Sequence, residues 1–230
     1  MMKVAAHEID GDDVLTFSPE TMAALVSLGI NVAHDGTRPI LQIQKDEASS
    51  DDQKSSFGVE EDWRLSQFWY DKETCNTLAD EALDVCQEGL IACVAAPSAF
   101  HEIQARKHDG VFLLEYDDRF QRYGDKFIYY DYNHPTVPSH ILHKCRFIII
   151  DPPYLSEECL SKVLETVSNL ATSPDDCKIL INTGAIMQGF LLKTMPNFHV
   201  TTWRPTHERN LGNEFLCFAN YSSKRLDLPK

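Results

Sequence analysis

The sequence predicts an α/β domain whose mostly parallel sheet is covered by helices on both faces. Three observations support this fold class. From Val59 onward, short apolar runs alternate with stretches of helical periodicity. The runs, such as "FIII" at 147–150, are apolar throughout, which is typical of strands buried on both faces. The last two runs have a loop between them instead of a helix, so we expect them to be antiparallel neighbours.

The individual elements follow in order along the chain. Residues 73–89 carry apolar side chains on one helical face and stop at Gly89, which favours a first core helix. Pro97 fits the first turn of the second. The predicted helices are 73–89, 97–107, 156–170 and 185–192. The predicted strands are 90–96, 111–117, 127–132, 146–151, 177–184, 199–205 and 214–222.

Residues 1–58 differ in composition, and we expect them to form an acidic extension to a domain at 59–230. Up to Asp62 the chain carries 13 acidic and 4 basic residues. Ser18 and Gly29 are suited to cap the two ends of a short helix. The polar run 44–56 lacks an apolar period and predicts a mobile linker. The extension is then either a passive solvated tail or a docking arm for a partner.

The composition argues against several classes of function. The formal net charge is −14, whereas nucleic-acid binders gain affinity from basic side chains, so we expect no nucleic-acid partner. No apolar run has the length of a membrane helix, and the first residues lack the pattern of a secretory signal. Seven cysteines without a CxxC pair favour a reducing cytoplasm. His140, His143 and Cys145 lack a fourth ligand at a suitable spacing, so we expect no metal site. We also expect the protein to be a monomer.

Polar or small residues follow several predicted strands, at the edge where a parallel sheet binds its ligands. Small residues and a helix start follow the first strand, where free N–H groups favour an anion. The carboxylate of Glu115, after the second strand, is suited to bind the hydroxyls of a ribose. After the third strand, the acidic Asp131 stands next to the aromatic Tyr132. These residues are Ala95, Ala96, Pro97, Ser98, Glu115, Asp131 and Tyr132. Together they indicate a nucleoside-type ligand, although each alone is a weak signal: a glutamate at a strand end is more often solvated or capping than functional, and "AAPS" fits any tight turn from a strand to a helix.

The fourth strand ends in Asp151, Pro152, Pro153 and Tyr154. Proline fixes φ and removes an N–H donor, so the carbonyl groups around it stay rigid and free to accept. Asp151 adds an acceptor, and Tyr154 offers a ring face to a planar or cationic group. Such a set is suited to an amine or amide N–H group that must be aimed at an electrophile. The alternative is a rigid turn with a packed tyrosine.

With these residues the chain resembles class I S-adenosylmethionine-dependent methyltransferases that carry an (Asp/Asn)-Pro-Pro-Tyr motif. It is most similar to the family of elongation factor 1-alpha lysine methyltransferase 1, formerly named as a putative N6-adenine-specific DNA methyltransferase. The similar stretches are "LSQFWY" (65–70), "IACVAAPS" (91–98), "LEYDDRF" (114–120), "YGDKFIYYDYN" (123–133), "DPPYLSEECL" (151–160), "TGAIM" (183–187) and "RNLGNEF" (209–215). The resemblance covers about 59–221 and implies a Rossmann-like sheet of seven strands.

The resemblance also implies roles for single residues. S-adenosyl-L-methionine would be held at its methionine end by Ala95, Ala96, Pro97 and Ser98, at its ribose by Glu115, and at its adenine by Asp131 and Tyr132. Gln67, Phe68 and Trp69 would cover the cofactor, unless these aromatic residues pack the edge of the sheet. The motif from Asp151 to Tyr154 would receive the target nitrogen, with Asp151 also beside the cofactor. The chain has "AAPS" where most class I methyltransferases have a glycine-rich turn.

Three functions remain open at this point. The first is a protein-lysine N-methyltransferase acting on elongation factor 1-alpha, which the close resemblance implies. The second is an adenine-N6 methyltransferase on DNA or RNA, and the third is a cofactor-binding module without catalysis. Polar residues between the last two strands, Arg204, Asn210 and Glu214, are expected to bind the target or to shape its entry. Alternatively, this polar connection only caps the strands.

Overall fold

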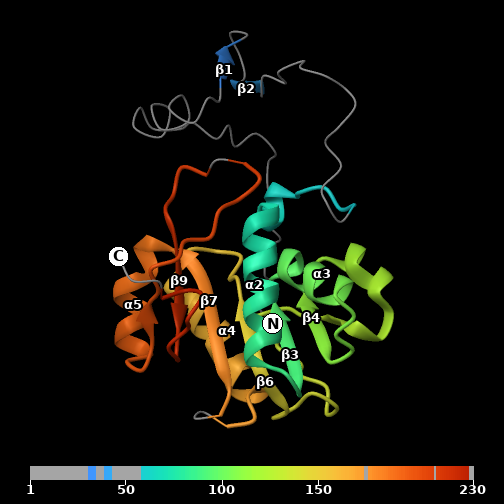
Figure 1. Cartoon of the computed structure of the whole chain (residues 1–230). Helices are drawn as coiled ribbons and strands as arrows, with labels where there is room; N and C mark the ends of the chain where they lie inside the picture. Colours follow the sequence, from blue (N-terminus) through green and yellow to red (C-terminus); the bar gives the residue numbers. More distant parts are fainter. Residues whose placement is uncertain (1–30, 35–38, 43–57, 174–175, 210, 228–230) are drawn as a thin grey trace, which may run out of the picture. The chain divides into compact units, whose positions relative to one another are not determined.

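The computed structural model describes residues 31–34, 39–42, 58–173, 176–209 and 211–227 (Figure 1). In the first part of the chain, β1 (Asn31–His34) and β2 (Pro39–Gln42) pair as an antiparallel two-stranded sheet. The sequence did not predict these two strands. The helix expected within 18–29 and the linker expected at 44–56 lie outside the described residues.

From Gly58 on, the described chain forms a seven-stranded sheet in the order β5-β4-β3-β6-β7-β9-β8. The strands β5, β4, β3, β6 and β7 are parallel neighbours, whereas β9 is antiparallel to both β7 and β8. The bounds are β3 (Leu90–Val94), β4 (Val111–Glu115), β5 (Phe127–Tyr129), β6 (Cys145–Ile150), β7 (Lys178–Gly184), β8 (His199–Val200) and β9 (Phe215–Ala219). The mostly parallel sheet, its seven strands and the antiparallel last pair are therefore confirmed.

Helices cover both faces of this sheet (Figure 1). On one face α2 (Lys72–Val85) and α3 (Pro97–Ala105) pack in a core with Ile91 and Phe147. On the other face α4 (Glu157–Leu170) and α5 (Gln188–Thr194) pack in a second core. Three 3₁₀ segments are η1 (Trp63–Leu65), η2 (Asp118–Lys126) and η3 (Ala185–Met187). Within the described part of the chain, no helix is both long and apolar enough to cross a membrane.

Several boundaries differ from the predicted ones for local reasons. Helix α2 begins after Asp71, whose side chain accepts from the Thr74 N–H group, and it ends at Val85, four residues before Gly89. Gly89 has φ +134°, so it serves the turn into β3 and not the end of the helix. The segment η2 was not predicted, because its first turn depends on the side chain of Asp117, which accepts from Arg119.

The register of the parallel strands brings their carboxyl ends to one edge. Val94 of β3 pairs with Leu114 of β4 and with Ile150 of β6. The next residue of each strand, namely Ala95, Glu115 or Asp151, therefore lies at the same edge of the sheet. The Asp151 N–H group confirms this proximity by donating to the Val94 carbonyl oxygen over 3.1 Å.

Candidate active site

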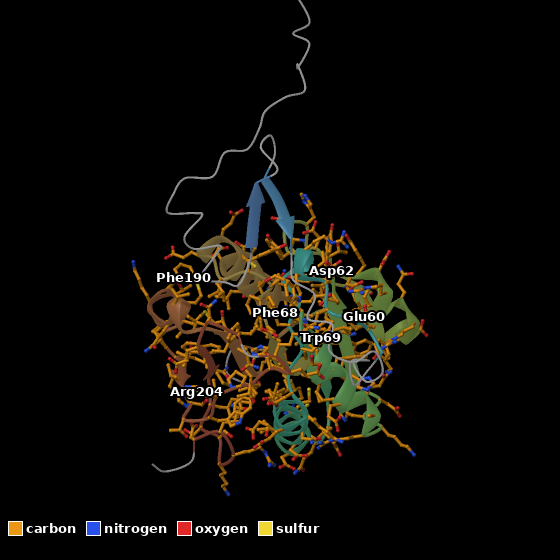
Figure 2. All side chains as sticks on the ribbon, turned by 90° about the horizontal axis from the view of Figure 1, so that it is seen from above. Glu60, Asp62, Phe68, Trp69, Phe190 and Arg204 are labelled. Atoms are coloured by element: carbon orange, nitrogen blue, oxygen red, sulfur yellow. The ribbon has the colours of Figure 1, made fainter. Side chains whose placement is uncertain are left out.

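A pocket of about 540 Å³ opens at this edge of the sheet. Its volume lies in the range of small-molecule sites. All but one of the predicted cofactor and motif residues line it: Gln67, Phe68, Trp69, Ala95, Pro97, Ser98, Glu115, Asp131, Tyr132, Asp151, Pro152, Pro153 and Tyr154. Ala96 is fully buried and precedes the first turn of α3. Figure 2 shows Phe68 and Trp69 near the middle of the molecule as seen from above Figure 1.

The turn between β3 and α3 places backbone donors at one end of the pocket. Ala95 has φ +50°, a left-handed conformation that glycine adopts more readily. Pro97 occupies the first turn of α3, and Ala96 supplies no side-chain cap. The N–H groups of that first turn are thus not capped by a side chain of the preceding residue, and they are suited to an anionic group of a ligand.

Glu115 ends β4 with one oxygen held and the other available. The backbone N–H groups of Tyr116 and Asp117 donate to its Oε1 over 3.0 and 3.1 Å. Oε2 accepts no hydrogen bond that the structure records, and the side chain lines the pocket. Burial raises the pKa of Glu115 to about 7, and the nearby charge of Asp117 acts in the same direction. A vicinal diol is a suitable donor for such an oxygen.

Asp131 and two tyrosines form the far wall of the pocket. The Asn133 N–H group donates to Oδ1 of Asp131 over 2.8 Å, so this carboxyl is fixed beside the pocket. The rings of Tyr132 and Tyr154 meet edge to face with centroids 6.2 Å apart. Tyr154 is 42% exposed, which places its ring at the opening of the pocket. A planar ligand ring would lie against Tyr132, with Tyr154 left for a second reactant.

The segment before α2 covers the pocket from one side. Phe68 is half-buried and lines the pocket. Trp69 is 2% exposed, and its indole N–H group donates to the Val59 carbonyl oxygen over 2.9 Å. Its ring packs edge to face against Phe120 in the core. Phe68 and Trp69 thus both line the pocket, and the Trp69 side chain also packs the core, whereas the expected role of this segment in covering a cofactor stays a prediction.

Asp151 lines the pocket directly after the end of β6. Burial raises the pKa of Asp151 to about 7. The Tyr70 hydroxyl opposes this rise, and the charge of Glu115 adds to it. A carboxyl with a pKa near 7 is partly ionised at neutral pH, and in its ionised form it accepts a hydrogen bond from a neutral N–H group.

Several pocket residues were missed by sequence reasoning. His207 lies between the rings of Tyr70 and Phe215, at centroid distances of 4.9 and 4.7 Å. Burial lowers the pKa of His207 to about 4, so the imidazole is neutral at physiological pH. Other lining residues that were not assigned are Leu65, Ser66, Tyr116, Tyr130, Asn133, Leu155, Leu211, Gly212, Asn213 and Phe215. The last four lie in the stretch "RNLGNEF" (209–215), from which the prediction chose Asn210 and Glu214 instead.

Of the expected target-binding residues that the structure describes, Tyr154 lines the pocket, whereas Arg204 and Glu214 are not among the lining residues. Nε of Arg204 is 3.5 Å from Oε1 of Glu214, and Nη1 of Arg204 donates to the Thr201 carbonyl oxygen over 2.6 Å. In Figure 2, Arg204 lies well away from Phe68. Asn210 lies outside the described residues. The roles of Tyr154, Arg204, Asn210 and Glu214 in binding the target remain predictions.

Metal and disulfide chemistry have no visible support in the described residues. No group of three or more His, Cys, Asp or Glu side chains in that part of the chain is arranged to hold a metal ion. All seven cysteines are described, and all are buried free thiols. Burial raises the pKa of Cys93 and Cys217 above the usual thiol value, so these thiols are neutral and inert.

Residues 61–223 match the profile of a family described as "Probable N6-adenine methyltransferase". The chain belongs to this methyltransferase family. The methyltransferase profile thus spans the pocket, its cover segment and the motif at Asp151.

Relatives of this chain carry names that specify another target. EEF1A lysine methyltransferase 1 of Mus musculus is 41% identical over 221 residues, covering 94% of this chain and 96% of the relative. The Homo sapiens protein of that name is 45% identical over 187 residues, covering 79% and 85%. Protein-lysine N-methyltransferase M142.8 of Caenorhabditis elegans is 37% identical over 228 residues, covering 93% and 97%. The family description names adenine, whereas these relatives are named for lysine.

Proposed function

We propose that this chain is an S-adenosyl-L-methionine-dependent protein-lysine N-methyltransferase whose substrate is translation elongation factor 1-alpha. The relatives named for that activity align with nearly the whole chain. The structural observation that carries the proposal is the shared pocket of Glu115, Asp151 and Tyr154. The pocket has the size of a small-molecule site, and its lining includes the Asp151 carboxyl, a hydrogen-bond acceptor, and the ring of Tyr154.

The residues present fit this cofactor. Its carboxylate would lie at the N–H groups of α3, whose first turn has no side-chain cap. Its ribose would donate to the open oxygen of Glu115, and its adenine would lie between Asp131 and Tyr132 under Phe68. The bound cofactor supplies a methyl group on a cationic sulfonium, which is already a strong electrophile. The remaining task of the protein is alignment, which contributes up to roughly 7–11 kcal/mol.

The target amine must reach the mouth of the pocket without a proton on its lone pair. A lysine ammonium has a pKa of about 10.4 in water. Desolvation among Tyr132, Tyr154 and Phe215, together with the cationic sulfonium, would lower that pKa. Asp151 then accepts a hydrogen bond from one of the remaining N–H groups of the amine and so orients its lone pair toward the methyl group. The ring face of Tyr154 stabilises the positive charge that develops on the nitrogen. The proton lost by the ammonium leaves through the open side of the pocket at Tyr154.

Adenine-N6 methylation of DNA or RNA is the second candidate, because the family description and the motif both allow it. Nucleic acid would have to approach a chain of net charge −14, which disfavours phosphate binding. A basic protein is drawn by the same field. The charge therefore favours the protein substrate.

The test is methyl transfer from radiolabelled cofactor to purified elongation factor 1-alpha and, in parallel, to double-stranded DNA. We expect label in the protein and none in the DNA, with Asp151→Asn losing at least 100-fold in kcat. Asp125→Asn is the matched control, because Asp125 is exposed and lies outside the pocket. Label in DNA alone would establish the second candidate, and cofactor binding without any product would indicate a module without catalysis.

The same proposal includes the setting of the enzyme. We place it in the cytoplasm as a monomer, with 59–230 as the catalytic domain and 1–58 as an acidic extension. The profile match at 61–223 and the buried thiols support this division and this compartment. Size-exclusion chromatography with light scattering tests whether the protein is a monomer. Fractionation of cells tests the cytoplasmic location.

A further inference from the structure

Tyr70 is a fully enclosed tyrosine directly behind the predicted motif. It is 1% exposed and does not line the pocket. Its backbone N–H group donates to Oγ of Ser98 over 3.4 Å, and it forms an isolated antiparallel bridge with His207. The backbone of Tyr70 is therefore held between Ser98 in α3 and His207 in the loop before β9, and its ring packs against the His207 ring with centroids 4.9 Å apart.

The sheet register brings Asp151 and Asn182 together beneath this ring. Ile150 of β6 pairs with Ile181 of β7, so the next residues, Asp151 and Asn182, are lateral neighbours. The alternation of side chains places both on the face where Leu180 packs with Tyr70 in one core cluster. The Tyr70 hydroxyl accordingly interacts with the Asp151 carboxyl and the Asn182 amide.

The Tyr70 hydroxyl and the Asn182 amide are not accounted for by hydrogen bonds to other described residues. Neither the Tyr70 hydroxyl nor either polar atom of the Asn182 amide makes a hydrogen bond of regular geometry to a described residue. Asn182 is fully buried. Buried polar groups without such bonds are rare in native structures and call for an explanation, of which a catalytic role is one.

We propose that Tyr70 is a positioning residue for Asp151: its hydroxyl donates to the carboxylate and, with Asn182 alongside, holds it ionised and aimed at the target amine. This inference rests on the proposed function, since it assigns Asp151 the task of orienting that amine. The donor must come from Tyr70, because a phenol is the stronger acid of the two neighbours. Asn182 fixes the other side of the hydroxyl oxygen through its NH₂ group.

The charged groups around the pair act in known directions. Burial and the charge of Glu115 on β4 raise the pKa of Asp151, and the Tyr70 hydroxyl is the group that lowers it. Tyr70 itself has a pKa well above its usual range, because burial and the charge of Asp151 disfavour its anion. Cys217 on β9 faces Tyr70 as a neutral thiol, and His207 is neutral. Tyr70 therefore stays a donor at every pH at which the enzyme works.

The decisive experiment is a ¹³C NMR titration of the aspartate carboxyl groups in the whole protein, with the Asp151 signal assigned from Asp151→Asn. In Tyr70→Phe we expect the Asp151 midpoint to rise by about one pH unit, a tenfold change in proton affinity. Tyr123→Phe is the control, because that hydroxyl contacts His101 at 2.9 Å, outside the pocket. An unchanged or lower midpoint in Tyr70→Phe overturns the inference.

A second readout does not depend on the Tyr70→Phe variant being folded. In the wild-type protein with ¹³Cζ-labelled tyrosine, the Tyr70 signal should shift with the same midpoint as Asp151. Independence of the two signals would also refute the contact.

Methyl transfer then separates the two proposals. Tyr70→Phe should lower kcat about fivefold at pH 7, because a smaller fraction of Asp151 is ionised, and kcat should recover at pH 9, with the KM for the cofactor unchanged. A loss of equal size at both pH values would reduce Tyr70 to a structural residue. If the wild-type protein methylates no elongation factor while the titration shifts as expected, the proposed function fails and the placement of Tyr70 stands.

Discussion

The side-chain amide of Gln67 donates a 2.9 Å hydrogen bond to Oδ2 of Asp117, fifty residues further along the chain. Nη2 of Arg119 donates to the other end of the same amide, Oε1 of Gln67, over 2.9 Å. Both Gln67 and Asp117 are buried. One glutamine thus fastens the cover segment to the loop that follows β4, on the side where Glu115 meets the pocket.

Gln67→Ala should loosen the cover and weaken cofactor binding. A hydrogen bond to a charged group contributes about 1.5–3 kcal/mol, so the dissociation constant should rise about tenfold or more. Calorimetric titration with S-adenosylhomocysteine measures the effect. Gln121→Ala, at an exposed position outside the pocket, should bind as the wild type does. Equal affinities of both variants would show that the cover does not contribute.

Cofactor affinity should fall at acid pH because of Glu115. Its pKa is about 7, raised by burial, so the carboxylate that accepts from a ribose is lost as the pH falls through 7. Below that value the affinity should decline by about tenfold per pH unit. Titrations at pH 6, 7 and 8 should show this decline in the wild type. Glu115→Gln should bind less tightly at pH 8 with a shallower decline, whereas exposed Glu88→Gln should keep the wild-type profile.

Ala95→Gly should stabilise the protein. Ala95 has φ +50°, a region that costs a residue with a Cβ about 1–2 kcal/mol. Part of this gain is offset by the greater entropy of glycine in the unfolded chain. We expect a net gain of about 0.5–1 kcal/mol, measured by urea unfolding. Ala105→Gly in the last turn of α3 has no positive φ to relieve and should destabilise the protein. The same sign for both variants would contradict this explanation.

Glu214→Ala should affect the protein substrate and not the cofactor. Glu214 pairs with Arg204 beside the pocket, and its backbone carbonyl accepts from the Ala185 N–H group over 2.8 Å, a bond that the substitution leaves intact. We expect the KM for elongation factor 1-alpha to rise severalfold, while the affinity for S-adenosylhomocysteine stays constant. Glu165→Ala on α4, which lies outside the pocket, is the control. An unchanged KM would leave the Arg204 pair a purely structural contact.

The sequence predicted the sheet well because its strands are continuous apolar runs, and such runs need both faces covered. The placement of Glu115 and Asp151 at one edge was predictable for the same reason, since they lie at the carboxyl ends of parallel strands, and those ends meet at one edge. Tyr70 and His207 were not assigned, because their meeting depends on a bridge between segments far apart in the chain. No local pattern encodes such a contact. The predicted end of α2 at Gly89 was wrong, because glycine is as common in turns as at helix ends, and Gly89 belongs to the turn before β3.

The strand order has a consequence for biosynthesis. β9 lies between β7 and β8, although it is made after both. Until 215–219 have left the ribosome, β7 presents an unpaired edge whose Ile179, Leu180 and Ile181 are otherwise buried. Such an edge is a template for pairing with other chains. Nascent chains halted before this point should therefore depend on chaperones, and sheet closure should be a late event of synthesis.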